Sequence, residues 1–309
     1  MDGSDVLAVS ENEGAGRKSE DWFEGDGSND SSPVRFVERR VGGRRRTDKA
    51  VLQVVPTSRE SAATVSLIIP TKNEARNLAD VLDHLPEQIA EVLLVDTRST
   101  DVTKLMARSV RPDIRIIDEP RPGKGLALRA GMAAAKGDVL VMMDADGSMS
   151  PEEIPRLVYP LEHGFDLTKG SRFIAGGGSL DITPTRRLGN RALVEMANVL
   201  LGVHFTDLCY GFLAFRRIFL DALDLQSTGF EIETEIIVRA QLLGLRIAEV
   251  PSVELPRRSG HSNLHAMQDG ARVLHTLLLE RRTQRSDDED APITLDTVEN
   301  LRVPTLTRS

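Results

Sequence analysis

Two aspartates follow the apolar run at residues 139–143, which has the length and composition of a buried strand. Asp144 and Asp146 are two residues apart, and Gly147 comes directly after them. In open α/β sheets, ligands bind at the edge where such strands end. Two carboxylates there would provide hard oxygen ligands for Mg²⁺ or Mn²⁺, which keeps other coordination positions for water and a diphosphate. The alternative is an acidic turn, because Asp and Gly are common turn residues.

Polar residues also follow the other strands predicted in the first half of the chain. The sequence Pro70-Thr-Lys-Asn-Glu74 comes after the first strand, and Asp96 ends the second. We expect these side chains to lie near the aspartate pair, because parallel strands end at one edge of a sheet. Asp96 could accept hydrogen bonds from a base or a ribose. Lys124 lies in Pro122-Gly-Lys-Gly125 at a predicted helix start, where backbone N–H groups and the helix dipole favour a diphosphate.

Composition and missing motifs exclude several functional classes. The chain has neither the P-loop spacing nor a G-x-G-x-x-G after its first strand, which disfavours a dinucleotide-dependent dehydrogenase. The formal charge of −8 argues against nucleic acid as a partner. The single cysteine, Cys209, excludes an intramolecular disulfide and is typical of a reducing compartment.

The elements that must position these residues alternate between strand and helix. In the first half, apolar runs predict strands at 65–70, 91–96, 115–118 and 139–143. Helical patterns separate or follow them at 75–85, at about 100–110, at 124–136 and from 151. Asn73 could cap the first of these helices. The second half predicts helices at 186–201 and 231–243, and strands at 211–216 and 246–250. Strands joined by helical crossovers indicate an α/β fold with a mostly parallel, Rossmann-like sheet flanked by helices.

The two ends of the chain differ in composition from the middle. Residues 1–63 are predicted to form a disordered tail, because the first thirty contain few apolar side chains. Residues 64–283 would form the folded domain, and 284–309 a second, acidic and disordered tail. The N-terminal tail contains a basic run at 39–46, which could be a solvated linker or could attract anionic lipid or a phosphorylated acceptor. An amphipathic helix is predicted at 266–282.

The sequence favours a cytoplasmic location. No apolar run approaches the roughly 20 residues that a transmembrane helix needs. The N-terminal sequence Met1-Asp-Gly-Ser-Asp-Val6 has no basic region followed by an apolar one, so it does not resemble a secretory signal. The basic run and the amphipathic helix leave open a peripheral contact at the inner face of the membrane.

In their order along the chain, several motifs resemble family 2 glycosyltransferases of the GT-A fold. The resemblance is strongest to the polyprenyl-phosphate (dolichol-phosphate) mannosyl- and glucosyltransferases, and it covers about residues 65–265. The matching sequences are Ile68-Ile-Pro-Thr-Lys-Asn-Glu74, Val95-Asp96 with Ser99-Thr-Asp101, Gly123-Lys-Gly125 with Gly131, Asp144-Ala-Asp146, Gly170-Ser-Arg172 and Thr206-Asp-Leu-Cys-Tyr-Gly-Phe212. This chain has Thr97-Arg98 where the family usually has Asp-Gly, which leaves the identity of the base open.

The resemblance implies a GT-A (nucleotide-diphospho-sugar transferase) fold and an inverting transfer of a hexose from a nucleotide-diphospho-sugar donor. Pro70, Glu74 and Asp96 would hold the nucleoside of the donor. Asp144 and Asp146 would bind Mg²⁺ or Mn²⁺ on the diphosphate. Our own reading of the helix start adds Lys124 as a further positive charge for the phosphates.

Other matching residues belong to the sugar and acceptor side of the implied site. Ser171, Arg172 and Asp207 would flank the sugar and the acceptor. Asp207 could act as the base for a hydroxyl acceptor, or only orient a phosphate acceptor, which needs no base. Glu231 or Glu233 could line the acceptor side, although a solvated helix face is the simpler reading. The polar segment 257–263 could close over the phosphates or form a surface loop.

The sequence leaves the acceptor and two other functions open. The acceptor could be a polyprenyl phosphate or a small soluble molecule. A sugar-nucleotide pyrophosphorylase is disfavoured, because the first strand is not followed by a glycine-rich loop with a basic residue. A non-catalytic nucleotide-sugar-binding protein is disfavoured by the presence of Lys124, Asp207 and the Asp144/Asp146 pair.

Overall fold

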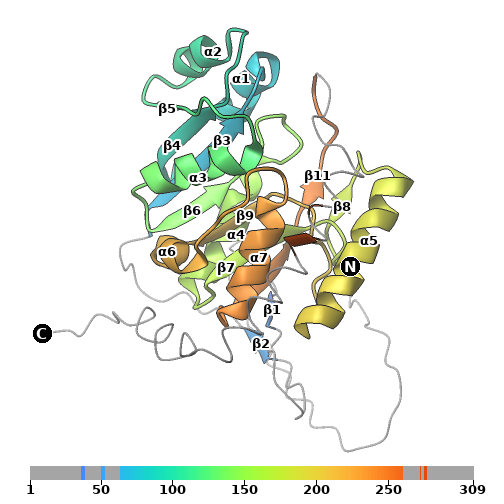
Figure 1. Ribbon diagram of the computed structural model, residues 1–309. Coiled ribbons are helices and arrows are strands. Elements are labelled where there is room, and N and C mark those ends of the chain that lie inside the picture. Colours follow the sequence, from blue (N-terminus) through green and yellow to red (C-terminus); the bar gives the residue numbers. More distant parts are fainter. Residues whose placement is uncertain (1–35, 39–49, 53–62, 260–271, 273–274, 277–309) are drawn as a thin grey trace, which may run out of the picture. The chain divides into compact units, whose positions relative to one another are not determined.

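A seven-stranded sheet forms the centre of the molecule in the computed structural model, which describes residues 36–38, 50–52, 63–259, 272 and 275–276 (Figure 1). The strand order is β10-β7-β9-β6-β3-β4-β5. Strand β9 is antiparallel to both of its neighbours, and the other neighbouring strands are parallel. The strands are β3 (Val65–Thr71), β4 (Ile89–Asp96), β5 (Arg115–Asp118), β6 (Val139–Met142), β7 (Leu167–Ser171), β9 (Leu213–Arg216) and β10 (Ile247–Pro251).

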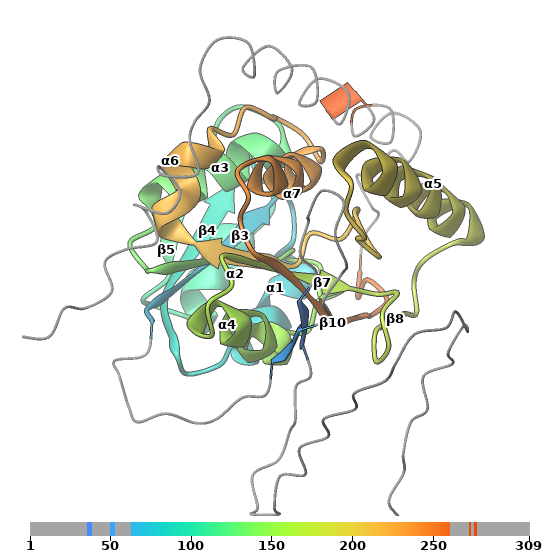
Figure 2. The same cartoon turned by 90° about the horizontal axis from the view of Figure 1, so that it is seen from below.

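Helices cover both faces of this sheet (Figure 2). One face carries α1 (Ala75–Asp83), α2 (Thr103–Val110) and α4 (Ile154–Glu162), the last preceded by the 3-10 turn η1 (Pro151–Glu153). The other carries α3 (Lys124–Ala134), α7 (Ile232–Leu242) and the short α6 (Leu220–Leu223), which follows the 3-10 turn η2 (Arg217–Phe219). The predicted α/β class with a mostly parallel, helix-flanked sheet is therefore confirmed.

Alternation along the strands supplies the core on both faces of the sheet. Leu67 and Ile69 of β3 belong to the cluster under α1 and α4, whereas Ile68 between them packs in the cluster with α3 and α7. All three side chains are fully buried. This two-sided burial explains why the middle of the strand is an unbroken apolar run and why its Ser66 and Thr71 are buried as well.

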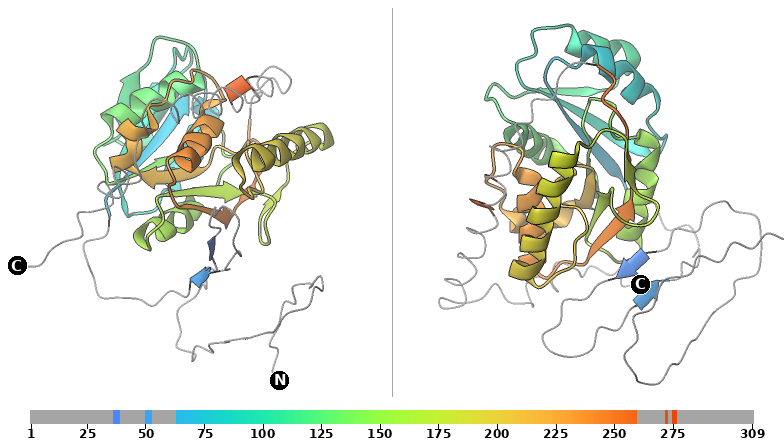
Figure 3. Two further views of the ribbon diagram at one scale, coloured as in Figure 1. Left: turned by 60° about the horizontal axis from the view of Figure 1, so that its bottom comes forward. Right: turned by 90° about the vertical axis from the view of Figure 1, so that its right-hand side faces the viewer.

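Helix α5 (Pro184–Leu201) extends from this three-layer arrangement and packs on α7 (Figure 3). It begins at Thr183, whose hydroxyl accepts a hydrogen bond from Arg186 N, and ends at Gly202 in the left-handed conformation. Strand β8 (Gly178–Ser179), which precedes α5 in the sequence, pairs in parallel with β11 (Val253–Glu254), which follows β10. These segments bring residues that are far apart in the second half of the sequence to one wall of the site described below.

Asn73 does not cap α1, so that prediction is wrong. Its backbone has a φ of 59°, and its Oδ1 accepts a hydrogen bond from Thr100 N at 2.8 Å. Its own N–H donates to Ser99 Oγ at 2.8 Å. The first helical N–H, that of Ala75, donates instead to Asp101 Oδ2 at 3.3 Å. Asn73 thus ties the loop after β3 to the loop after β4, at the edge where the site residues gather.

The predictions for the two ends of the chain lie mostly outside the described residues. Within 1–63, the structure describes the antiparallel pair β1 (Phe36–Glu38) and β2 (Ala50–Leu52), together with residue 63. The basic run at 39–46 and the acidic tail at 284–309 are not described, and of the helix predicted at 266–282 only residues 272, 275 and 276 are, all helical. Among the described residues, no helix combines the length and apolar character that a membrane crossing requires.

Helix α3 approaches the sheet most closely at Gly131. A Cβ atom there would lie 2.9 Å from Val95 Cγ2 and even closer to Ile68 Cγ2. We expect Gly131→Ala to lower the free energy of unfolding by about 1–3 kcal/mol, because the extra methyl group overpacks this contact. Urea denaturation measures the change. The matched control is Gly189→Ala in α5, where nothing lies within 4 Å of the added Cβ.

The control should be neutral or stabilising by up to about 1 kcal/mol, because alanine favours helix more than glycine does. Equal unfolding free energies for Gly131→Ala and the wild type would show that α3 can shift away from β3 and β4 without cost.

Candidate active site

A cavity of about 730 Å³ opens where β3, β4 and β6 end. It is lined by six residues that the sequence predicted for the site: Pro70, Glu74, Lys124, Asp144, Asp146 and Arg172. The three other predicted residues, Asp96, Ser171 and Asp207, are not among the lining residues. The structure therefore gathers the predicted phosphate and metal residues in one place and leaves three predicted carboxylate and hydroxyl groups behind the cavity wall.

Lys124 is a largely buried cation in the lining of this cavity. Its Nζ lies 2.5 Å from Asp144 Oδ1 and 2.6 Å from Glu233 Oε1, and only 10% of its side chain is exposed. Burial alone would lower the pKa of Lys124, but the two carboxylates outweigh this effect and raise it. Burial raises the pKa of Glu233, while Lys124 opposes that shift. Lys124 therefore carries a fixed positive charge between the end of β6 and helix α7.

The glycines beside Lys124 make room for protein rather than for a phosphate. A Cβ atom at Gly125 would overlap the backbone of Ser227 and Thr228. The N–H of Leu126, in the first turn of α3, donates to Thr228 O at 3.3 Å. The predicted cradle of backbone N–H groups is thus partly occupied by the chain itself, and the lysine side chain is the part of the motif that lines the cavity.

The aspartate pair after β6 faces two side-chain cations. Asp144 contacts Lys124, and Asp146 Oδ2 lies 3.3 Å from Arg257 Nη1. The other oxygen of Asp146 accepts hydrogen bonds from the backbone N–H and the hydroxyl of Ser148, at 3.0 and 2.7 Å. Gly147 turns the loop with a φ of 78°. Hard carboxylate oxygens that already attract cations fit a divalent ion such as Mg²⁺ or Mn²⁺.

No group of three or more His, Cys, Asp or Glu residues could hold a metal ion by itself in the described part of the chain. A metal at Asp144 and Asp146 would therefore complete its coordination with water and ligand oxygens. This arrangement suits Mg²⁺ and Mn²⁺, which commonly bind through one or two carboxylates together with phosphate oxygens.

Arg257 also reaches Glu74, at the far side of the metal pair. The guanidinium pairs with Glu74 Oε1, while Glu74 Oε2 accepts a hydrogen bond of 2.5 Å from Asn77 Nδ2. Burial raises the pKa of Glu74, against the opposing effects of Asn77 and Arg257. Glu74 was predicted for the site as a nucleoside-binding residue, whereas Arg257 was covered only by the polar segment 257–263 after the last strand.

Asp96 is buried beside the cavity with one oxygen unsatisfied. Its side chain is 1% exposed, and Oδ2 accepts a hydrogen bond from Ser99 N at 3.1 Å. Oδ1 has no hydrogen-bond partner among the described residues. Buried carboxylate oxygens normally have partners, so this atom is a ready acceptor for a ligand N–H or O–H. The neighbouring Thr97 lines the cavity. Arg98 has a φ of 60°, in the left-handed region that glycine adopts more readily than other residues.

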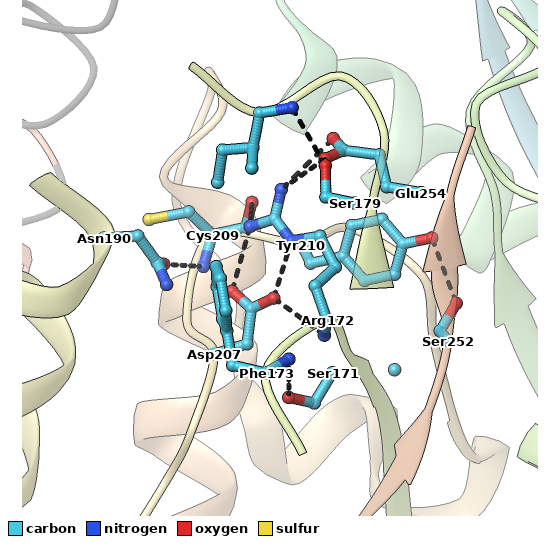
Figure 4. Close-up of polar contacts among 12 residues, drawn as sticks. Ser171, Arg172, Phe173, Ser179, Asn190, Asp207, Cys209, Tyr210, Ser252 and Glu254 are labelled. Atoms are coloured by element: carbon cyan, nitrogen blue, oxygen red, sulfur yellow. Dashed lines mark hydrogen bonds and ion pairs between the residues drawn. The ribbon is translucent and has the colours of Figure 1, made fainter. Parts of the chain in front are cut away.

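Arg172 and Asp207 form a buried ion pair behind the other end of the cavity (Figure 4). Arg172 Nε lies 2.7 Å from Asp207 Oδ2, and Nη2 lies 3.0 Å from Oδ1. The remaining nitrogen of the guanidinium, Nη1, contacts both oxygens of Glu254 at 3.1 Å. These carboxylates raise the pKa of Arg172 despite its burial, which acts in the opposite direction. Both oxygens of Asp207 are thus engaged, and its role as a base stays a prediction.

Buried polar contacts fix the segment that carries Asp207. Ser171 Oγ lies 2.6 Å from Thr206 Oγ1, so Ser171 links two parts of the chain rather than facing the cavity. Lys169 of β7 is fully buried, and its Nζ donates to the backbone oxygen of Asp207 and to Glu249 Oε1, at 2.5 and 3.3 Å. Neither Lys169 nor Glu249 was predicted for the site.

The wall opposite the charged residues comes from the segment before α5 and from α5 itself. It is partly apolar, and its members include Ile182, Ala192, Leu193 and Met196. Arg186 lies beside them and pairs with Asp181 at 3.4 Å and Glu254 at 3.6 Å. Cys209 also lines the cavity, but burial raises the pKa of its thiol to about 12, so it is not a nucleophile at neutral pH.

Comparisons with known proteins find one family. The sequence pattern of Glycosyl transferase family 2 matches residues 66–224. Glycosyltransferase AglJ of Haloferax volcanii is 33% identical over 223 residues, which are 71% of this chain and 72% of that protein. The undecaprenyl-phosphate mannosyltransferase of Micrococcus luteus is 35% identical over 212 residues, 65% of this chain and 87% of its own.

A solved structure shares the fold as well. It is glucosyl-3-phosphoglycerate synthase from Mycobacterium tuberculosis in complex with Mn²⁺, uridine-diphosphate and glucosyl-3-phosphoglycerate. The TM-score is 0.56 at 25% sequence identity, over 71% of this chain and 80% of that one.

Proposed function

Because the chain belongs to glycosyl transferase family 2, we propose that it transfers a hexose from a nucleotide-diphospho-sugar to a polyprenyl phosphate, with inversion at the anomeric carbon. The observation that carries this proposal is the cavity itself. One end holds Asp144, Asp146 and Lys124, which suit a metal-bound diphosphate, and the other end has the partly apolar wall of α5. A phosphate joined to a long apolar chain needs both kinds of surface.

The donor end supports the departure of a nucleoside diphosphate. Breaking the bond to the anomeric carbon leaves negative charge on the leaving oxygen and positive charge on the sugar. A Mg²⁺ or Mn²⁺ ion on Asp144 and Asp146 would supply a Lewis acid for the leaving group. Lys124 would add a fixed positive charge beside it. Asp96 Oδ1, without a partner among the described residues, would accept a hydrogen bond from the nucleoside.

The acceptor end supports a phosphate as the attacking group. A phosphate oxygen is already charged, so it needs no side chain to remove its proton. A phosphate acceptor therefore agrees with the burial of Asp207, whose carboxylate pairs with Arg172 and need not act as a base. Arg172 and Arg186, which both line the cavity, would attract the acceptor phosphate toward the sugar. The name of the Micrococcus luteus relative, an undecaprenyl-phosphate mannosyltransferase, points to the same class of acceptor.

A small soluble acceptor is the second candidate. It is favoured by the solved relative that is a glucosyl-3-phosphoglycerate synthase, because 3-phosphoglycerate also carries a phosphate. The same arginines would suit either molecule, and only the polyprenyl chain would use the apolar wall of α5.

A two-stage experiment tests the proposal. Nucleotide diphosphates and nucleotide sugars are first screened by thermal shift, with and without Mn²⁺. At about 100 times the Kd, a ligand adds about 2.7 kcal/mol of stability. For a folded region of this size we expect that gain to raise Tm by about 5–10 °C, and only with Mn²⁺. The donor identified in this way is then offered with a polyprenyl phosphate, the corresponding polyprenol and 3-phosphoglycerate.

We expect transfer to the polyprenyl phosphate alone. The polyprenol is the control, because it has the same chain without the phosphate. Transfer to 3-phosphoglycerate instead would establish the soluble acceptor. If no nucleotide sugar changes Tm in the presence of Mn²⁺, the proposed donor site is wrong.

A further inference from the structure

The side chain of Arg257 bridges two carboxylates that come from different strand ends. Its Nη1 lies 3.3 Å from Asp146 Oδ2, and its Nη2 pairs with Glu74 Oε1. Asp146 follows β6, and Glu74 follows β3. The guanidinium therefore lies between two residues of the proposed donor site, with 19% of the Arg257 side chain exposed.

The backbone around Arg257 has hydrogen bonds of its own, in addition to the one that Arg257 Nε donates to Ser259 O at 2.9 Å. Leu255 N donates to Ser148 O at 2.8 Å, and Arg258 N donates to Asp146 O at 3.3 Å. Ser259 Oγ donates to Asn77 Oδ1 at 2.7 Å. Because these bonds fix the segment 255–259 to the loop after β6 and to α1, the Arg257 side chain can leave Asp146 while the backbone stays in place.

The charges around Arg257 show what could replace it. Lys124 contacts Asp144 and Glu233, and Arg257 contacts Asp146 and Glu74, so two cations face four carboxylates. With all groups ionised, two negative charges remain, which one divalent ion would balance. Of the two cations, Arg257 is the more easily displaced from its aspartate. Its contact with Asp146 is 3.3 Å, against 2.5 Å between Lys124 and Asp144.

We propose that Arg257 holds Asp146 in place of a divalent ion, and that it moves onto the donor diphosphate when metal and nucleotide bind. This inference rests on the proposed function, because it needs the metal at Asp144 and Asp146. A guanidinium suits both positions, since its planar fork pairs with carboxylates and with phosphates. Arg257 is thus a positioning residue that exchanges one anionic partner for another.

The exchange makes the effects of Arg257 on metal and nucleotide opposite in sign. Without nucleotide, a metal ion must compete with Arg257 for Asp146, so the arginine weakens metal binding. With metal bound, the released guanidinium can contact the diphosphate, so the arginine strengthens nucleotide binding. The two ligands are then coupled through one side chain, and the coupling must be reciprocal.

The test compares Arg257→Ala with Arg258→Ala in the full chain. Arg258 is the matched control, because its Nη2 pairs with Asp80 at 2.8 Å, and its hydrogen bond to Asp146 O comes from the backbone N–H, which alanine keeps. Mn²⁺ binding without nucleotide is followed by electron paramagnetic resonance. We expect Arg257→Ala to bind Mn²⁺ about 5-fold more tightly than the wild type, which is the lower end of typical coupling. At saturating Mn²⁺, it should bind UDP or GDP, whichever the wild type binds, about 10-fold more weakly. Arg258→Ala should match the wild type in both.

A third variant separates this inference from the proposed function. Asp146→Ala should lose Mn²⁺ binding, and if it binds Mn²⁺ like the wild type, the proposed metal site is wrong. If Asp146→Ala loses Mn²⁺ but Arg257→Ala binds Mn²⁺ no more tightly than the wild type, the metal site stands and the exchange is refuted. Arg257→Gln repeats the measurement with a polar side chain, in case the alanine variant folds poorly.

Discussion

Asp146→Ala should lower kcat/KM for sugar transfer by about 10³-fold or more, because a metal on the leaving group is worth several kcal/mol in the transition state. The variant should also lose the dependence of donor binding on Mn²⁺. Its fold should persist, because the Asp146 side chain contacts only Ser148 and Arg257 in the described part of the chain. Initial rates at several donor concentrations and circular dichroism measure the two effects.

The control for this variant is Asp113→Ala. Asp113 is an exposed aspartate that pairs with Arg111 at 3.2 Å, outside the cavity lining. Its loss should leave kcat/KM and metal dependence unchanged. If Asp146→Ala transferred sugar at the wild-type rate with the same response to Mn²⁺, Asp146 would not be a metal ligand. Lys124 would then be the main cation that stabilises the leaving group.

The first half of the fold follows from its sequence because β3, β4 and β6 are mostly buried and the edge strand β5 is half-buried, so each contains a run of apolar residues. The run 115–118 coincides with β5, and the predictions for β3, β4 and β6 differ from the structure by one or two residues at an end. Their apolar side chains need no specific partner to be buried, so local composition is enough to identify them.

Strand β7 was not among the predicted strands, and it shows why the second half of the fold was harder to predict. It has the sequence Leu-Thr-Lys-Gly-Ser, and all five residues are buried. A lysine is stable there only because Glu249 and a backbone oxygen from the distant segment at 207 accept its hydrogen bonds. Those partners are about 40 and 80 residues away in the sequence. A local pattern cannot show that they exist.

The candidate site likewise contains some residues that the sequence identified and others that only the structure shows. Asp144, Asp146 and Lys124 line one cavity, because the ends of parallel strands and the starts of the following helices meet at one edge. Arg257 and Glu254 lie in the segment after β10, a strand that runs parallel to β3 and β6, so they too follow a strand end at that edge. Their recognition required the fold, since each is defined by ion pairs with residues more than 80 positions earlier.

Asp207→Asn should cost about 3–5 kcal/mol of unfolding free energy, the usual effect of removing one partner from a buried ion pair. Asp207 is fully buried, and both of its oxygens contact Arg172. An amide would keep one acceptor and turn its NH₂ group toward the guanidinium, where two donors oppose each other. Urea denaturation gives the stability. We also expect turnover of the folded protein to fall by about 10²-fold, the scale on which displaced catalytic geometry acts.

The two roles considered for Asp207 differ in which acceptors are affected. If it positions Arg172, turnover should fall with a phosphate acceptor, and the pH dependence of the residual activity should keep its shape. If it is a base, the loss should be confined to hydroxyl acceptors, and the acidic limb of the pH profile should disappear. Asp166→Asn is the matched control, because Asp166 is also fully buried and pairs with Arg246 at 3.3 Å, away from the cavity lining. The control should lose stability but keep its turnover, since neither Asp166 nor Arg246 is among the residues that line the cavity, whereas Arg172 is.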